Sequence, residues 1–470
     1  MEFKSESIGK VEIINDKDSS KYLGIRLQGA SHLVSMPSNE LTNIIALALI
    51  DKGIKPSSNL IKKTTEELEA FSFRVQDIEE VHTRYAIKKD CLYIRLGDGD
   101  MLLKISEKGI KRLKNKNIRF KYSKHINKLP YQDEAEGNLE LFWKYASVSS
   151  EEDKLLLLVY LINACLPDTN YPILLITGGP GSGKSFLTYM IEALIDPTNF
   201  GLSASLESPE DIVLAAIHNH LLRFDNNGVF NAKIQNLLCQ VSTGAKLSLR
   251  KLFTNKGVMI TELSRPIIIN SLRSPFSQHD VIDRVLHLRL RQLTPKDYAK
   301  TGGEKKWKAQ YEADLPSILK GFYQILQRVI MIRDTVKLPS ELPRMADYAI
   351  LGIAVEQALK FKKGTFLKAY ENNLSHGLSQ IIEDSELAHA LISLAGNLKE
   401  AKTYKRNDLI QLLKNYSGSP QALPKTAKEL GAELEKIRKS LFKLKGIRIA
   451  FLNRSGAGYR VKITPPSKGS

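Results

Sequence analysis

An octapeptide in the middle of the chain combines the residue types that bind the phosphates of a nucleotide. Residues 178–185 read Gly-Gly-Pro-Gly-Ser-Gly-Lys-Ser, which fits the pattern G-x-x-x-x-G-K-[ST]. The glycines let backbone N–H groups converge on phosphate oxygens, Lys184 supplies charge for the β- and γ-phosphates, and Ser185 ligates Mg²⁺. The pattern predicts a site for ATP and Mg²⁺, and a glycine-rich linker turn is the alternative. The predicted nucleotide-binding residues are Gly178, Gly179, Pro180, Gly181, Ser182, Gly183, Lys184, Ser185 and Phe186.

Two further strand-like segments end in polar residues that suit the same chemistry. Leu221-Leu-Arg-Phe-Asp225 would place Asp225 as the second Mg²⁺ ligand. The amide of the next residue, Asn226, cannot take a proton as a carboxylate does, so Asn226 orients the attacking water or another carboxylate is the base. Arg265-Pro-Ile-Ile-Ile-Asn270 would place Asn270 as a sensor of the γ-phosphate. A simple turn at the end of the strand is the alternative for Asp225 and for Asn270.

Two arginines downstream are candidates for contact with the γ-phosphate. Arg284 ends the motif Asp280-Val-Ile-Asp-Arg and precedes a strand-like run, so it could reach the nucleotide of a neighbouring subunit as an arginine finger. Arg273 is the second candidate for this role, and a salt bridge from Arg284 to Asp280 or Asp283 is the alternative. Arg344 opens a predicted helix and would report the γ-phosphate from a lid over the nucleotide, unless it is a solvated arginine in a first helical turn.

The elements that must position these residues form an alternating pattern of strands and helices. The apolar run Tyr171–Thr177 predicts a buried strand before the octapeptide, and apolar residues spaced i, i+4 from Phe186 to Ile195 predict a helix after it. The alternation continues to about residue 295, which predicts an α/β fold with a parallel sheet. We expect four domains: a mixed α+β module over 1–135, an ATPase core over 136–295, a helical lid over 296–384 and a basic module over 385–470.

Composition and charge limit the partners of the chain. Its 470 residues are 43% hydrophobic and carry a net charge of +18. From Lys402 to the end there are 16 Lys/Arg against 4 Asp/Glu, a net charge of +12, which favours a nucleic-acid partner over an anionic membrane or an ordinary solvated face. The three cysteines show no paired spacing, the N-terminus has no apolar signal segment, and the longest apolar stretch, Leu155–Leu166, is too short to span a bilayer. These features predict a cytoplasmic protein with no membrane partner.

Two segments could contact DNA directly. Leu247–Thr254 and Val258–Leu263 are β-rich and are joined by Asn255-Lys-Gly257, which predicts a hairpin with Lys256 at its tip. In a ring of subunits Lys256 would project into the central channel toward single-stranded DNA, and an ordinary surface hairpin is the alternative. A basic run over residues 111–124 could touch a phosphate backbone or be a solvated face.

The C-terminal module has the pattern of a winged helix. Helices are predicted over 405–414, 426–431 and 433–445, followed by paired strands over 447–452 and 459–463. The third helix would enter a major groove, and a winged helix used only for protein contacts is the alternative. The predicted DNA-binding residues of the module are Lys436, Arg438, Lys439, Lys443 and Arg454.

The order of these motifs resembles a known family. The octapeptide, Asp225-Asn226, the hairpin, Asn270, Asp-x-x-Asp-Arg284 and Pro-Arg344-Met-Ala-Asp are similar to the AAA+ replicative helicases of mobile genetic elements, of the staphylococcal pathogenicity-island initiator and cassette-chromosome helicase type, and through them to superfamily 3 and MCM helicases. The resemblance covers about residues 80–465. It implies an AAA+ P-loop ATPase core, a homo-oligomeric ring, commonly a hexamer, and binding of the element's duplex origin through the C-terminal domain. The N-terminus lacks the zinc or acidic motifs of a fused primase, so a separate primase or polymerase is a candidate partner.

The resulting prediction is an ATP-dependent DNA helicase and replication initiator of a mobile element. The alternative is a DNA-dependent ATPase switch, a regulatory or defence protein that binds DNA without unwinding it. The arginine pattern and the basic C-terminus disfavour a small-molecule kinase, which would share only the P-loop.

Overall fold

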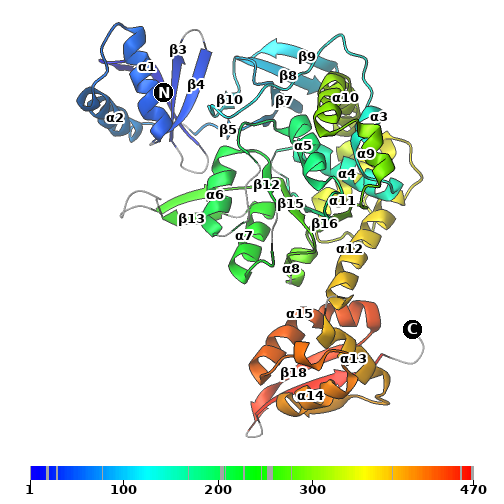
Figure 1. Ribbon diagram of the computed structural model, residues 1–470. Coiled ribbons are helices and arrows are strands. Elements are labelled where there is room, and N and C mark those ends of the chain that lie inside the picture. Colours follow the sequence, from blue (N-terminus) through cyan, green and yellow to red (C-terminus); the bar gives the residue numbers. More distant parts are fainter. Residues whose placement is uncertain are drawn as a thin grey trace.

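Figure 1 shows the computed structural model of the chain, coloured from blue to red along the sequence. The chain forms an N-terminal unit, a central unit with a second antiparallel sheet packed against it, and a C-terminal unit. It describes residues 2–16, 21–27, 30–36, 38–76, 78–167, 169–201, 206, 208–225, 228–244, 246–250, 258–276, 278–383, 385–455 and 458–466. Asn226 and Lys256, two predicted site residues, lie outside these ranges. No helix of the described residues has the length and apolar character needed to cross a membrane.

The N-terminal unit, residues 2–76, is an antiparallel four-stranded sheet with two helices. Its elements are β1 (Glu2–Ser5), β2 (Gly9–Asn15), β3 (Lys21–Leu27), β4 (Ala30–Met36), α1 (Asn39–Asp51) and α2 (Ser58–Ser72), and the strand order is β1-β2-β3-β4. Both helices begin at serine caps, Ser38 and Ser57, which accept backbone N–H groups of the first turn. Apolar residues of β2–β4 and α1 form a hydrophobic core of their own.

A second antiparallel sheet, β6-β7-β8-β9, follows. The strands of this segment are β5 (Val81–His82), β6 (Tyr85–Lys88), β7 (Cys91–Arg95), β8 (Met101–Ser106), β9 (Gly109–Lys114) and β10 (Arg119–Phe120). The guanidinium of Arg84 is fully buried and pairs at 2.8 Å with the buried carboxylate of Asp196. This ion pair ties the second sheet to the end of the helix that follows the octapeptide.

The central unit, residues 139–383, is built on a parallel sheet. Its strands are β12 (Leu222–Phe224), β15 (Ile267–Ser271), β11 (Ile173–Thr177) and β16 (Val285–Arg289), in that spatial order. Every residue of β11 and β15 is buried, as expected for strands covered on both faces. The predicted strands at these four places and their parallel pairing are confirmed.

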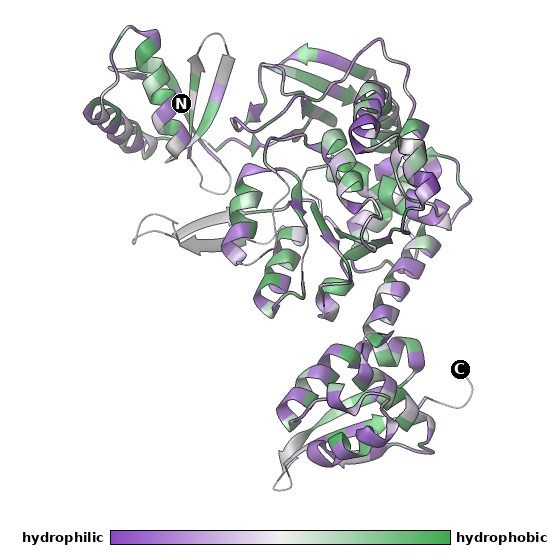
Figure 2. Ribbon diagram, in the orientation of Figure 1, coloured by the Kyte–Doolittle hydropathy of each residue, from purple (hydrophilic) through white to green (hydrophobic). Residues whose placement is uncertain are grey.

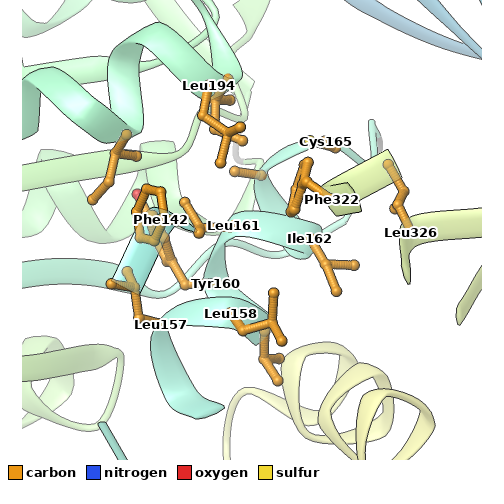
Figure 3. Packing of buried hydrophobic residues seen from close by; sticks show 14 of the residues in the cluster. Phe142, Leu157, Leu158, Tyr160, Leu161, Ile162, Cys165, Leu194, Phe322 and Leu326 are labelled. Atoms are coloured by element: carbon orange, nitrogen blue, oxygen red, sulfur yellow. The ribbon is translucent and has the colours of Figure 1, made fainter. Parts of the chain in front are cut away.

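Helices cover the sheet on both faces. The helices from Glu140 to Ile282 are α3 (Glu140–Tyr145), α4 (Glu151–Ala164), α5 (Lys184–Ile195), α6 (Pro209–His218), α7 (Ala232–Thr243) and α8 (His279–Ile282). Helix α4 is buried along ten consecutive residues, and Figure 3 shows its apolar side chains beside Leu194 of α5 and beside Phe322 and Leu326 of α10 (Glu304–Ile332). The apolar run over 155–166 is thus a core helix that precedes β11.

The helical segment after the sheet packs into the same core. It consists of α9 (Pro295–Thr301), α10 (Glu304–Ile332), the 3-10 turn η1 (Arg333–Thr335), α11 (Ala346–Ala358) and α12 (Thr365–Glu383). One hydrophobic cluster joins residues of β6–β8, α3–α5, α10, α11 and α12. The expected domain boundaries near residues 135 and 295 therefore do not separate independent cores, because apolar faces on both sides of each boundary are buried against each other.

The predicted hairpin is present as a pair of antiparallel strands, β13 (Lys246–Arg250) and β14 (Val258–Glu262). Arg250 pairs with Val258 at the end nearest the tip. Figure 1 shows the hairpin extending away from the central unit beside α6.

The C-terminal unit, residues 385–466, lies at the far end of α12 (Figure 1). Its elements are α13 (Glu386–Gly396), β17 (Lys402–Lys405), α14 (Arg406–Leu413), η2 (Lys414–Tyr416), η3 (Pro420–Ala422), α15 (Ala427–Lys445), β18 (Arg448–Ser455) and β19 (Gly458–Thr464). The sheet order is β17-β19-β18, and apolar residues of all three helices and of the sheet form one core. In Figure 2 these helices alternate hydrophilic and hydrophobic stretches, as expected when one face of each is buried.

One prediction for this unit was wrong. The helices expected over 426–431 and 433–445 are a single helix, α15, which continues through Gly431. The glycine allows a close approach instead of a break, since a Cβ there would lie 2.3 Å from Nη1 of Arg406. Thr426 caps the helix as predicted, accepting the N–H of Glu429 at 3.2 Å.

Candidate functional site

The octapeptide, called the P-loop below, turns directly from β11 into α5. Gly181 and Gly183 have φ values of +71° and +83°, a left-handed conformation that other residues rarely adopt. Gly183 immediately precedes α5, so Lys184 and Ser185 stand in the first turn of the helix. The local structure is the strand, glycine-rich loop and helix that a phosphate-binding loop requires.

Lys184 and Ser185 form hydrogen bonds with the loop itself and with the end of β12. The Nζ atom of Lys184 donates to the carbonyl oxygens of Gly178 and Gly179 at 2.7 and 3.1 Å, so the lysine is folded over the loop. Burial lowers the pKa of Lys184, and the charge of Asp225 opposes this shift. The hydroxyl of Ser185 donates to Oδ2 of Asp225 at 3.3 Å. A hydroxyl and a carboxylate oxygen so close together suit a Mg²⁺ ion, for which both are ordinary ligands.

The strand register explains why Asp225 and Asn270 meet the P-loop. Phe224 pairs with Ile269, and Asn270 pairs with Ile176, so the polar residues lie at the carboxyl ends of three adjacent parallel strands. Ligands of open parallel sheets bind at this edge. The structure therefore brings Asp225 and Asn270 to the end of the sheet from which the P-loop leads, and Asn226 adjoins Asp225 in the sequence.

Sequence reasoning missed the partner of Asn270. The hydroxyl of Thr188, on α5, donates to Oδ1 of Asn270 at 3.0 Å, and both residues are at most 1% exposed. The Nδ2 atom of Asn270 is buried and has no hydrogen-bond partner among the described residues. A buried donor without a partner is costly, so an acceptor such as a phosphate oxygen or a bound water is the natural complement. Thr188 lies one helical turn beyond Ser185 on the same face of α5, which is the one signal that could have singled it out.

Two further contacts hold the P-loop in place. The hydroxyl of Tyr298, on α9, donates to the carbonyl of Gly181 at 2.8 Å. Thr177, the last residue of β11, has its Oγ1 2.6 Å from Nε2 of His287 on β16. Burial, followed by the nearby charges of Arg289 and His376, lowers the pKa of His287 to about 4, so this imidazole is neutral at pH 7.

A cavity of about 670 Å³ adjoins the P-loop beside Ser185. Thr188, Tyr189 and Glu192 of α5 line it, together with Arg223 of β12 and residues of α10. Glu192 forms an ion pair with Arg223, and burial raises its pKa, an effect that Arg223 opposes. Glu192 stands two helical turns beyond Ser185, and its carboxylate pairs with Arg223.

Arg284 and Arg344 lie near the amino ends of the strands, at the end of the sheet opposite to the P-loop. Arg284 immediately precedes β16, and its backbone carbonyl accepts the N–H of Ile173, the first residue of β11. Arg289, at the P-loop end of β16, is five positions beyond Arg284, a separation of about 16 Å along the strand. Arg284 donates from Nη1 to the backbone carbonyl of Asp280 at 2.5 Å, and its Nε is buried without a partner among the described residues.

Arg344 joins this second group. Its Nη1 pairs with the carboxylates of Asp280 at 3.0 Å and Asp283 at 3.8 Å. The pKa of Asp280 is lowered chiefly by the hydrogen bond from Arg344, although partial burial acts against this, and Lys439 and Arg284 add to the lowering. The connection from η1 to α11 thus places Arg344 beside the segment that leads into β16, and its role toward a γ-phosphate stays a prediction. Arg273, by contrast, is exposed just beyond β15 at the P-loop edge.

The predicted DNA-binding residues of α15 fall into different surroundings. Lys436 and Lys443 are exposed. Arg438 pairs with Glu435 at 2.5 Å and lies over the ring of Phe451, whereas Nζ of Lys439 is 4.0 Å from Asp280 of the central unit. The side chain of Arg454 lies outside the described part, although its backbone belongs to β18.

Residues 139–377, slightly more than half of the chain, match the family model described as actinomycete integrative conjugative element replication protein. Among solved structures, SCCmec type IV Cch, an active helicase, is similar with a TM-score of 0.46 and 12% identity, over 97% of this chain and 93% of that chain. The apo C-terminal region of NrS-1 has a TM-score of 0.39 and 11% identity, covering 97% of each chain. The JCV helicase has a TM-score of 0.23 and 14% identity, over 49% of this chain and 66% of that chain. No curated protein matches the sequence.

Proposed function

The chain belongs to the family of actinomycete integrative conjugative element replication proteins, and from this premise we propose that it is an ATP-dependent DNA helicase that initiates replication of a mobile element. In this proposal the central unit is an AAA+ ATPase core with its helical lid. Residues 385–466 are a winged-helix domain that binds the duplex origin, which the element order α13-β17-α14-α15-β18-β19 supports. The protein acts as a homo-oligomeric ring, in which a hexamer encloses single-stranded DNA.

The observation that carries the proposal is the separation of the two halves of the site. Lys184, Ser185 and Asp225 lie at the carboxyl ends of the strands, whereas Arg284 and Arg344 lie near the amino ends. In a head-to-tail ring the arginines of one copy would face the P-loop of the next copy. Each nucleotide is then held between two copies, and hydrolysis depends on assembly.

The roles of the residues follow from their chemistry. Lys184 and the backbone N–H groups of the P-loop bind the triphosphate, and Ser185 and Asp225 hold Mg²⁺, which neutralises phosphate charge when bound. Asn270, oriented by Thr188, donates its free amide N–H to the γ-phosphate or the attacking water. Arg284 and Arg344 of the neighbouring copy stabilise the negative charge that develops as the bond to the γ-phosphate breaks.

In this proposal the hairpin of β13 and β14 moves along the DNA, and Lys256, in the segment that joins the two strands, contacts it. Such hairpins, arranged around a channel, would track the phosphate backbone as successive sites hydrolyse ATP. A separate primase or polymerase would then copy the unwound strands.

A forked DNA duplex with one labelled strand tests the proposal. The wild-type chain should release the labelled strand in the presence of ATP and Mg²⁺. The Lys184→Ala variant should bind DNA but release nothing, because it lacks the charge that holds the β- and γ-phosphates. Absence of strand release by the wild type, with an ATPase rate that DNA does not change, would contradict the proposal.

The second candidate function is a DNA-dependent ATPase switch. Its support is the contact of Lys439, on α15, with Asp280, which also holds Arg344. DNA bound at α15 would compete for Lys439 and so alter the surroundings of Arg344. The same assay separates the two candidates, since a switch shows DNA-stimulated ATP hydrolysis without strand release.

A further inference from the structure

The outer face of the C-terminal sheet gathers basic side chains on β17 and β19. Val461 and Ile463 of β19 are fully buried. Arg460, which precedes Val461, and Lys462, which lies between the two, therefore point to the opposite, solvent side. Arg460 is directly opposite Lys405 of β17. Thr464, next on the same side, is opposite Arg448 of β18. The residues of this outer face are Thr403, Lys405, Arg448, Ala450, Leu452, Arg460, Lys462 and Thr464.

This face carries no acidic residue among those just listed. Lys405, Arg448 and Lys462 are exposed, Arg460 is half-buried, and none of the four forms an ion pair within the described chain. The guanidinium of Arg448 lies over the ring of Phe442 on α15, 4.8 Å from its centre, so the cations directed to the outer face are Lys405, Arg460 and Lys462. Like charges directly opposite each other, as Lys405 and Arg460 are, destabilise a sheet by a few tenths of a kcal/mol or more. Surface sheets commonly intersperse both signs of charge, so an unrelieved row of cations indicates an anionic partner.

The face is separate from the helix predicted to read DNA. Ile449, Val461 and Ile463 point inward to the core that the sheet shares with α15, so α15 lies on the other side of the sheet. The unit thus has exposed cations on two opposite sides, Lys436 and Lys443 on α15 and Lys405 and Lys462 on the outer face.

We propose that the outer face of β17, β18 and β19 binds the phosphodiester backbone of a second nucleic-acid segment. The inference rests on the proposed DNA binding by this unit. Basic side chains recur two residues apart along β19, about 6.6 Å, and on adjacent strands about 4.8 Å apart, which gives a flat surface that can follow a chain of phosphates. Leu452 and Ala450 are the apolar residues of the face, too little apolar area for insertion into a membrane.

Salt dependence of DNA binding by the full chain, without nucleotide, tests the proposal. The triple variant Lys405→Gln, Arg460→Gln, Lys462→Gln removes three cations of the outer face. The matched control, Lys362→Gln, Lys363→Gln, Lys399→Gln, removes three exposed cations elsewhere. The slope of log K against log salt should become shallower by about 2–3 for the first variant and stay unchanged for the control. Labelled single-stranded and duplex oligonucleotides are used in parallel, and the one whose binding falls identifies the bound form.

The outcomes separate this inference from the proposed function. If the outer-face variant keeps the slope of the control while Lys436→Gln, Lys443→Gln weakens duplex binding, the inference fails and DNA binding by α15 stands. If the wild-type chain binds no DNA, both fail. If the outer-face variant instead loses binding to phosphatidylserine vesicles while DNA binding is intact, the partner is a membrane and the inference is overturned. Lys462→Glu alone, with an expected slope change of about 1 or more, replaces the triple variant if that variant does not fold.

Discussion

Nη1 of Arg344 pairs with the carboxylate of Asp280 at 3.0 Å, although the two residues are 64 positions apart. Asp280 also accepts a hydrogen bond from Arg284 through its backbone carbonyl. A single short segment before β16 therefore gathers both arginines that were predicted to contact a γ-phosphate. The P-loop of the same chain lies at the opposite end of the strands. In the proposed ring, both arginines would therefore act on the nucleotide of a neighbouring copy.

Replacement of either arginine should separate ATP binding from hydrolysis. We expect Arg284→Ala and Arg344→Ala to lower kcat for ATP by about 10³-fold or more, the range found for arginine fingers. Affinity of the isolated chain for ATP should change little, because neither side chain reaches its own P-loop. Steady-state hydrolysis and equilibrium binding of a fluorescent ATP analogue measure the two effects. A large loss of ATP affinity in the isolated chain would place the arginines in their own site.

Thr188→Val should impair the proposed sensor without disturbing nucleotide binding. The valine keeps the shape of the side chain but leaves Oδ1 of the buried Asn270 without its donor. The amide is then free to turn, and its N–H is no longer aimed at the phosphate. We expect kcat to fall about 10-fold or more with KM for ATP nearly unchanged, whereas Thr188→Ser retains activity. Equal kinetics for the valine and serine variants would show that the hydroxyl has no orienting role.

Stability should fall on mild acidification because His287 is buried in its neutral form. Its pKa is about 4 in the folded chain against 6.5 in its ordinary state, so the unfolded chain takes up this proton first. The contribution of His287 is complete above about pH 6.5 and is lost as the pH falls toward 4. Thermal unfolding between pH 7.5 and 5 should therefore show a smaller decrease in Tm for His287→Gln, whose amide can still bond Thr177. Identical pH profiles for the two proteins would contradict this assignment.

The ion pair of Arg84 and Asp196 should be among the costliest interactions to break. Asp196 also accepts the backbone N–H groups of His220 and Leu221 at 3.0 and 3.1 Å. Asp196→Ala leaves the fully buried guanidinium of Arg84 uncompensated, with an expected loss of about 3–5 kcal/mol in the free energy of unfolding. Asp98→Ala, which removes exposed pairs with Arg112 and Lys128, is the control and should cost about 1 kcal/mol or less. Denaturant unfolding measures both, and comparable losses would mean that burial does not set the cost.

The sequence was most informative where a short segment decides its own structure. The strand over 171–177, the glycine-rich turn and the helix from Lys184 follow from local patterns of apolar residues and glycines, and the structure contains all three. The edge position of Asp225 and Asn270 could also be predicted, since parallel strands bring their carboxyl ends together. The predicted relationship to replication proteins of mobile elements is confirmed by the family match over residues 139–377.

Features set by long-range packing could not be predicted. The position of Arg344 depends on how the chain between α10 and α11 crosses the molecule, which no local pattern encodes. The sequence pattern predicts two helices over 426–431 and 433–445, whereas the close approach of Arg406 explains why a glycine stands at position 431 of one continuous helix. The shared core of β6–β8 with α4 and α10 arises because apolar faces from distant segments bury one another. Asn226 and Lys256 lie beyond the part of the chain that the structure describes, so their roles stay predictions.

Mixing of two inactive variants tests most directly the claim that each site is shared between copies. Lys184→Ala removes the phosphate-binding charge, and Arg284→Ala, Arg344→Ala removes both arginines, so each variant alone should hydrolyse ATP at a background rate. In a mixture, some interfaces combine the intact P-loop of one copy with the intact arginines of another, and ATP hydrolysis should recover to a measurable fraction of the wild-type rate. If no mixing ratio restores activity although the variants assemble together, the arginines act within their own chain and the account of a shared site is wrong.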